Sequence, residues 1–135
     1  MMDDLYRDHI LDHYENPRCH GNLPDADFVH EEDNPLCGDR LRIAVKLSED
    51  HTRIANAAFE GDGCIISQAA ASMLLEHVVG QSVEEVERFE PQAMLELVGV
   101  PLTANRVKCA LLGLKVLKTG LKLWQLQQRN GNAPE

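Results

Sequence analysis

The chain has 135 residues, 44% of them hydrophobic and 26% charged, and carries a formal net charge of −9 at pH 7. This length and composition are typical of one globular domain that buries its own core. No apolar stretch approaches the roughly 20 residues of a membrane-spanning helix, and the acidic start "MMDDLYRDHI" is unlike a signal peptide. We therefore expect a cytoplasmic protein without membrane contact, and the negative charge argues against non-specific binding to nucleic acid.

The first half of the chain is predicted to form one helix and a pair of strands. The stretch "DDLYRDHILDHYENP" has apolar residues at helical spacing, with Asp3 or Asp4 as cap and Pro17 as terminator. The stretches "RCHGNLPDAD" and "EEDNPLCGD" are rich in turn-forming residues. Apolar and polar residues alternate in "RLRIAVKLS", and "TRIANAAFE" follows after a polar turn. This pattern predicts an antiparallel hairpin.

A change of hydrophobic period marks the second half as helical. From Ser67 onward the apolar residues recur on one helical face, with Ser72 among the polar residues opposite and Gly80 as a C-terminal stop. Ser82 and Glu85 form a capping box for a short helix, and Pro91 opens another.

The last and longest predicted helix runs from about residue 105 to residue 128. One helix, a hairpin and then several helices make an α+β fold, with a small antiparallel sheet covered by helices on one face. We expect residues 1–128 to form a single domain and residues 129–135 to be a flexible tail.

Charge is unevenly distributed along the chain. Residues 1–96 carry 21 acidic and seven basic side chains, whereas residues 105–129 carry six basic side chains and no acidic one. We expect the basic segment to pack against the acidic remainder of the same domain, because charge runs usually form solvated faces. A partner-binding face is the second interpretation.

Three of the four cysteines stand where a thiol could carry chemistry. Cys64 follows "GDG" at a predicted helix start, where the helix dipole favours the thiolate that binds metals and attacks sulfur. Gly38 allows Cys37 and Asp39 to turn to one side of a loop, and a thiolate with a carboxylate suits zinc or iron. Cys109 lies early in the last helix. No pair has the C-x-x-C spacing, so a shared site depends on the fold.

Other candidate residues are assigned to structural roles. Cys19 has His20 beside it, yet nothing nearby completes a site, and we interpret it as a non-ligand. His9 and His13 share a helical face without a third ligand. Ser67 has no assignable base and is interpreted as a helix cap.

Four phrases together closely resemble the U-type iron–sulfur assembly proteins, the family of IscU, SufU and the NifU N-terminal domain. They occur in the family's order as "LYRDHILDHYENPR", "NPLCGDRLRI", "FEGDGCIISQAAASM" and "RVKCALLGLKVL". The resemblance covers about residues 5–121. It implies an α+β fold with a three-stranded sheet, and a site that holds a [2Fe-2S] cluster or Zn²⁺. The implied ligands are Cys37, Asp39, Cys64 and Cys109.

The resemblance also implies a function and partners. Sulfur would arrive from a pyridoxal-phosphate-dependent cysteine desulfurase, with Cys37 as the candidate acceptor, and the cluster would pass to apo iron–sulfur proteins. A carboxylate among thiolates makes a cluster easier to release, so replacing Asp39 by Ala is expected to trap it.

Two features separate subtypes within this family. Lys108 stands where IscU-like members have His, and "VGVPLTANRVK" replaces their Leu-Pro-Pro-Val-Lys motif, so nothing supports recruitment of a chaperone through that motif. These residues are similar to SufU, although SufU-like chains carry an additional segment before the last cysteine. Three hypotheses stay open: a non-enzymatic assembly scaffold, a zinc-dependent sulfurtransferase, and a structural zinc domain that binds partners.

Overall fold

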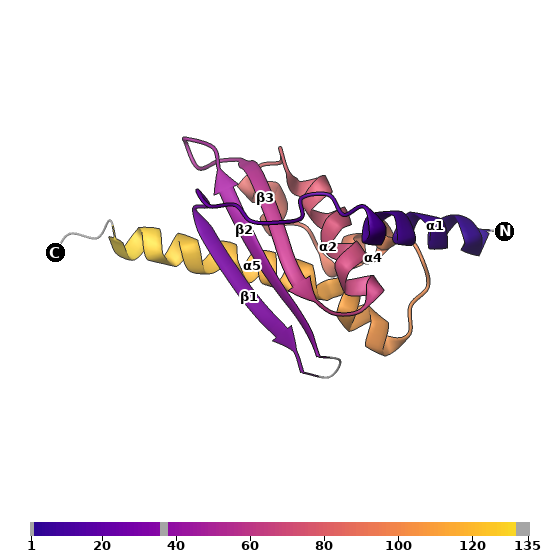
Figure 1. The fold of residues 1–135 in the computed structure, drawn as a ribbon. Helices are drawn as coiled ribbons and strands as arrows, with labels where there is room; N and C mark the ends of the chain where they lie inside the picture. The colour runs from indigo at the N-terminus through magenta and orange to yellow at the C-terminus, as the bar shows by residue number, and fades with distance from the viewer. Residues whose placement is uncertain (1, 36–37, 132–135) are drawn as a thin grey trace.

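The computed structural model describes residues 2–35 and 38–131, with an antiparallel sheet and helices that pack on it (Figure 1). Within these residues the elements follow in the order α1 (Met2–Glu15), β1 (Phe28–Asn34), β2 (Asp39–Leu47), β3 (Ile54–Asp62), α2 (Ile65–Val78), α3 (Val83–Glu87), α4 (Pro91–Val98) and α5 (Ala104–Gly131). The α+β class and its three-stranded antiparallel sheet are confirmed.

The sheet has the strand order β1–β2–β3, with both neighbouring pairs antiparallel. Ile43 in the central strand lies opposite His30 of β1 and Phe59 of β3. Alternate residues of β2 are fully buried beneath the helices: Leu41, Ile43, Val45 and Leu47. The predicted hairpin is confirmed as β2 and β3, with strand ends shifted by one or two residues.

The first strand differs from the prediction, because residues 31–34 of the turn-rich stretch form its second half. Glu31 lies opposite Arg42, and Asp33 opposite Arg40, so these acidic side chains face basic ones across the strands. Opposite charges in cross-strand pairs stabilise a sheet. A polar sequence can therefore form a strand here, although its composition alone is typical of a loop.

The helices cover the sheet and enclose the core. The long helix α5 crosses behind β1 and β2, α2 packs against β3 and α5, and α1 lies against α2 at the far end of the molecule from the end of α5 (Figure 1). The largest fully buried side chains come from the sheet and from these helices: Phe59, Leu41, Ile43, Ile54, Leu74, Leu75, Met94, Leu117 and Leu121. Replacing such a leucine by alanine costs about 2–5 kcal/mol.

Helix α5 approaches β1 closely because Gly120 has no side chain. A Cβ at this position would lie 2.8 Å from the His30 Cβ, closer than such atoms come in proteins. The helix also continues to Gly131 and thus includes the first residues of the predicted tail. Residues 132–135 of that tail lie outside the described residues.

Helix α2 begins at Ile65, two residues earlier than predicted, and one of its polar residues is not on a solvated face. Ser72 is fully buried. Its Oγ accepts the backbone N–H of Arg18 at 2.8 Å and lies 2.8 Å from Nδ1 of His13, which is buried too. The packing of α1 against α2 buries this polar face, which helical periodicity could not reveal. The predicted capping box at Ser82 and the start of α4 at Pro91 are confirmed.

Candidate metal centre

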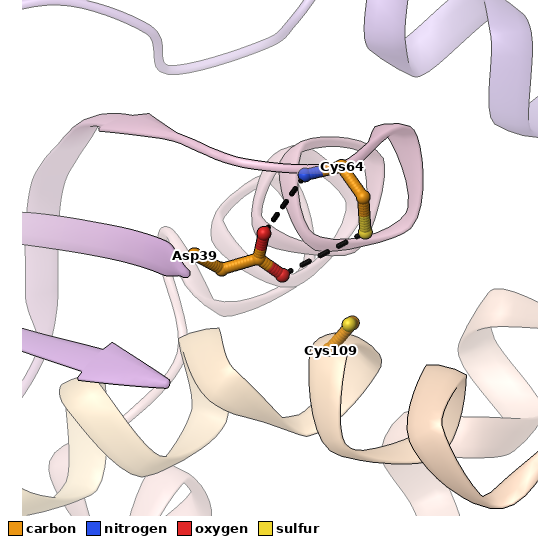
Figure 2. Close-up of side chains that lie close together, drawn as sticks. All are labelled: Asp39, Cys64 and Cys109. Carbon is orange, nitrogen blue, oxygen red and sulfur yellow. Dashed lines mark hydrogen bonds between the residues drawn. The ribbon is translucent and has the colours of Figure 1, made fainter. Parts of the chain in front are cut away.

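Three side chains from distant parts of the sequence converge on one point between the sheet and the helices (Figure 2). Asp39, Cys64 and Cys109 each offer one ligand atom, and these three atoms all lie within 4.8 Å of one another. Asp39 is 2% exposed and Cys109 is 3% exposed, while Cys64 is partly buried. The group therefore sits below the surface, with Cys64 as its accessible member.

Asp39 reaches this point as the first residue of β2. The preceding Gly38 has a φ of +74°, a conformation that favours glycine, and its N–H donates to the Asn34 carbonyl at 2.8 Å. This bond links the end of β1 to the start of β2. The Asp39 carboxylate is thus held at the end of the buried central strand.

Cys64 is the N-cap residue of α2, and its own side chain does not cap the helix. Instead its backbone N–H donates to Asp39 Oδ1 at 2.9 Å, and its Sγ lies 3.7 Å from Asp39 Oδ2 (Figure 2). A carboxylate at a helix N-terminus is stabilised by the free N–H groups and the helix dipole. Asp39 therefore positions the Cys64 backbone as well as offering an oxygen ligand.

Gly63, which precedes Cys64, and Ser67, three residues after it, surround this close approach. A Cβ at Gly63 would overlap the Asp39 carboxylate and would lie 2.8 Å from Ser67 Oγ, so only glycine fits here without displacement. Ser67 is fully buried, and its hydroxyl donates to the Cys64 carbonyl at 3.0 Å. The interpretation of Ser67 as the cap is wrong, because Cys64 occupies the N-cap position and Ser67 is a donor from inside the first turn.

Cys109 comes from the second turn of α5, which passes beneath the sheet and brings the buried thiol to the other two groups. The residues just before it on the same helix, Arg106 and Lys108, are exposed. Its position depends on helix packing and not on any local motif.

The donor set fits a metal ion. Two thiolates and one carboxylate match the preference of zinc and of iron in mixed sites. Two sulfurs bound to one tetrahedral zinc stand about 3.8 Å apart, given a Zn–S bond of about 2.3 Å. Because the three ligand atoms already lie within 4.8 Å, a shift of about 1 Å would suffice. Three negative groups buried together also need protons or a cation to balance their charge.

The remaining candidates stand apart from this group or outside the described residues. Cys37, the predicted fourth ligand and sulfur acceptor, lies outside them. Cys19 is not in the group; it has a φ of +60°, and burial, followed by the charge of Glu76, raises the pKa of its thiol. His13 serves the contact with Ser72, and His9 is exposed.

Sequence reasoning missed the residues that support the ligands. The sequence places Gly63 directly before Cys64, but it does not reveal that a side chain at this position would overlap the Asp39 carboxylate. The only sequence signal for this support is the short spacing from Gly63 and Cys64 to Ser67 around the helix start.

Across the part of the chain that the structure describes, no helix is both long and apolar enough to cross a membrane.

Comparisons with known proteins identify the relatives of this chain. The family described as "NifU-like N terminal domain" matches residues 5–131. The zinc-dependent sulfurtransferase SufU of Bacillus subtilis is 37% identical, with 89% of this chain and 91% of that protein covered. The iron–sulfur cluster assembly scaffold protein IscU of Thermotoga maritima is 36% identical, with 87% and 93% covered.

A solved structure shows the same architecture. It belongs to a protein from Fervidobacterium islandicum described as an iron–sulfur cluster assembly scaffold for the SUF system, with 28% identity and a TM-score of 0.70. The alignment covers 84% of this chain and 93% of that one. With this fold, this site and these matches, the chain belongs to the NifU-like N-terminal domain family of iron–sulfur assembly proteins.

Proposed function

We propose that this protein is an iron–sulfur cluster assembly scaffold that accepts sulfur from a cysteine desulfurase and builds a [2Fe-2S] cluster for transfer to apo-proteins. The convergence of Asp39, Cys64 and Cys109 within 4.8 Å is the observation that carries the proposal. The proposed site consists of these residues and of Cys37, two positions before Asp39 in the sequence. The predicted partners are a pyridoxal-phosphate-dependent desulfurase and apo iron–sulfur proteins. Free thiols need a reducing compartment, for which we propose the cytoplasm.

The mixed donor set supports a cargo role over permanent storage. Thiolates bind iron firmly, whereas a carboxylate oxygen is a harder ligand that exchanges more readily. Asp39 also has a second task in the protein, because its Oδ1 accepts the Cys64 N–H at 2.9 Å. When the cluster leaves, the Asp39 carboxylate can keep this hydrogen bond to the Cys64 N–H. This contact within the protein favours transfer of the cluster to another protein.

Sulfur delivery can proceed by thiol exchange without another oxidant. A thiolate of this chain, for which we propose Cys37, attacks the outer sulfur of the desulfurase persulfide. The bond between that sulfur and the desulfurase cysteine breaks, and the desulfurase cysteine departs as a thiolate. The persulfide is then carried by this chain, two positions before Asp39 in the sequence.

A zinc-dependent sulfurtransferase is the second candidate. It is supported by the 37% identity to a protein of that name. It is also supported by Lys108, which directly precedes Cys109 and stands where IscU-like members have His. In this case the same thiolates and the Asp39 carboxylate would hold a zinc ion, which keeps bound thiols deprotonated. The protein would then stimulate the desulfurase and relay sulfur without forming a stable cluster.

Anaerobic reconstitution tests the proposal directly. The purified protein would be mixed with ferrous iron, cysteine, a desulfurase and a thiol reductant that converts persulfide sulfur to sulfide, and followed by visible absorption. The scaffold role predicts thiolate-to-iron charge-transfer bands and subsequent transfer to an apo-ferredoxin. Zinc-loaded protein that accelerates the desulfurase without forming a cluster would instead establish the second candidate.

Variants of two cysteines provide the matched control. Cys64→Ser should abolish cluster formation, whereas Cys19→Ser should leave it unchanged because Cys19 lies outside the group of ligands. A protein that binds zinc but neither forms a cluster nor affects the desulfurase would overturn both candidates and leave a structural zinc domain.

A further inference from the structure

One face of α5 carries a row of lysines along a groove. Lys108, Lys115 and Lys122 are spaced by seven residues and therefore share a helical face, with Lys118 between them. Two adjacent hollows of about 400 and 440 Å³ follow this face, and Lys118 lines both of them. The groove starts at Lys108, the residue before Cys109 in the sequence, and follows the helix to Gln125.

The first hollow has an apolar floor beneath a rim of three lysines, Lys108, Lys115 and Lys118, and one acidic residue, Asp33. Leu111 and the more deeply buried Leu112 and Leu114 line it from α5, opposite the end of β1 at residues 33–35 and the start of α4 at Pro91. A concave apolar site edged by a few charges is the usual form of a specific binding pocket. Its size suits one large apolar side chain with its neighbours.

The charges of the rim are mostly not neutralised by the protein itself. Within the described chain, Lys115 alone among the basic residues of α5 forms an ion pair, with Glu32 at 3.3 Å. Lys118 donates to the Phe89 carbonyl at 2.9 Å. Lys108 and Lys122 are exposed, and no described carboxylate lies within 4.0 Å of their ammonium groups. Helix α5 packs against the acidic strand β1, and among the described residues this packing brings one lysine of α5 into an ion pair.

We propose that this groove binds an acidic amphipathic segment of a partner protein, with one apolar side chain in the hollow and carboxylates on the lysines. The 15 residues from Lys108 to Lys122 span about 21 Å of helix, a length that suits a short helix or an extended peptide. The acidic charge of the rest of the molecule disfavours long polyanions such as nucleic acid. Bound there, the segment places its protein beside Cys109, whichever metal the centre holds.

Binding of a designed peptide tests the groove without knowledge of the natural partner. The probe is a fluorescent 14-residue helix-forming peptide with leucines along one face and glutamates on the other. Fluorescence anisotropy should detect saturable binding that weakens with salt. Amide NMR shifts should change along α5 and at Asp33 and Asn34, while the same peptide with serines for leucines should bind at least about tenfold more weakly.

Two charge-matched double variants separate the groove from net charge. Lys108→Gln with Lys122→Gln should weaken binding by about tenfold, whereas Arg106→Gln with Arg129→Gln should change it by less than about twofold. Both pairs remove two exposed charges from α5, and circular dichroism confirms that each variant folds. Absence of binding, equal losses in the two variants, or self-association of the chain through this face would overturn the proposal.

Discussion

Two buried polar clusters in this protein have opposite chemistry. At the contact of α1 with α2, a neutral His13 ring can accept at Nδ1 the proton of the Ser72 hydroxyl, which itself accepts the Arg18 N–H. Donors and acceptors are balanced there, so the cluster needs no charge from outside. At the metal centre, a carboxylate and two thiols stand together, and all three become negative when ionised. The first arrangement joins two helices, whereas the second binds a cation.

Loss of a thiol at the centre should have the largest effect on metal binding. Cys64→Ser and Cys109→Ser should each weaken zinc binding by more than about 100-fold, because changes to residues that merely support a ligand already cost about 10–100-fold. Competition with a chromophoric chelator measures the affinity. Cys19→Ser is the control, and an equal loss in that variant would show that the thiols do not act as one group.

Replacement of Asp39 should lengthen the life of a bound cluster by about tenfold or more, because the most exchangeable ligand is removed. Transfer of the cluster to an apo-protein, followed by visible absorption, gives the rate. Asp39→Asn separates the two tasks of this residue. Its amide oxygen can still accept the Cys64 N–H, so it should resemble Asp39→Ala if ligation matters and the parent if only the hydrogen bond matters. Equal lifetimes in Asp39→Ala and the parent would contradict the assignment.

A substitution in the cluster of His13, Ser72 and the Arg18 N–H should lower the stability of the fold and leave the metal affinity unchanged. Ser72→Ala deprives the Arg18 N–H and the His13 ring of their partner, and an unsatisfied buried polar group costs about 1–3 kcal/mol. Urea denaturation should therefore show a lower free energy of unfolding, while zinc affinity remains within about twofold of the parent. A marked loss of metal affinity would mean that the two clusters are coupled.

A methyl group at Gly63 should disturb the metal centre by displacing the Asp39 carboxylate. Gly63→Ala places a Cβ against the Asp39 carboxylate and should cost about 1–3 kcal/mol of stability, with weaker metal binding as well. Gly113→Ala is the matched control, since its Cβ would lie 3.5 Å from the Ala71 Cα in ordinary contact. That control should be neutral or stabilising by up to about 1 kcal/mol. If Gly63→Ala behaved like it, the close packing around Asp39 would be refuted.

Acid should weaken the contact of α1 with α2, with a smaller effect on stability than the substitutions described above. Burial lowers the pKa of His13 below its usual 6.5, and the charges of Arg18 and His9 lower it further. The unfolded chain then binds more protons than the folded one below about pH 6.5, so the contribution of His13 is complete above that pH and is lost as the pH falls through the lowered pKa. The loss is at most about 1.4 kcal/mol per pH unit.

Urea denaturation at about pH 7.5, 6.5 and 5.5 measures this dependence. His13→Gln should flatten it, whereas His77→Gln should not, because His77 is exposed at the end of α2. Parallel curves for the parent and His13→Gln would show that His13 does not titrate with folding.

The elements that can be predicted from the amino-acid sequence are those whose signals are local. Alternation identified β2, the polar turn after it indicated β3 as the second strand of a hairpin, the pair Ser82 and Glu85 marked a helix start, and Pro91 began another helix. Thiols beside glycines singled out Cys64 and the loop before Asp39, and the four phrases indicated the family. These signals depend on hydrogen bonding and turn geometry within a few residues, so they can be read without the fold.

Which residues meet in space depends on how the helices and strands pack together. Glu31 and Asp33 look like loop residues until they face Arg42 and Arg40 across a strand. Ser72 looks solvated until α1 covers it, and no spacing rule connects Cys109 to Asp39. The physical reason is common to all three: the environment of these groups is set by contacts between elements far apart in the chain. A helical or strand period reports only which face a residue occupies, not what packs against that face.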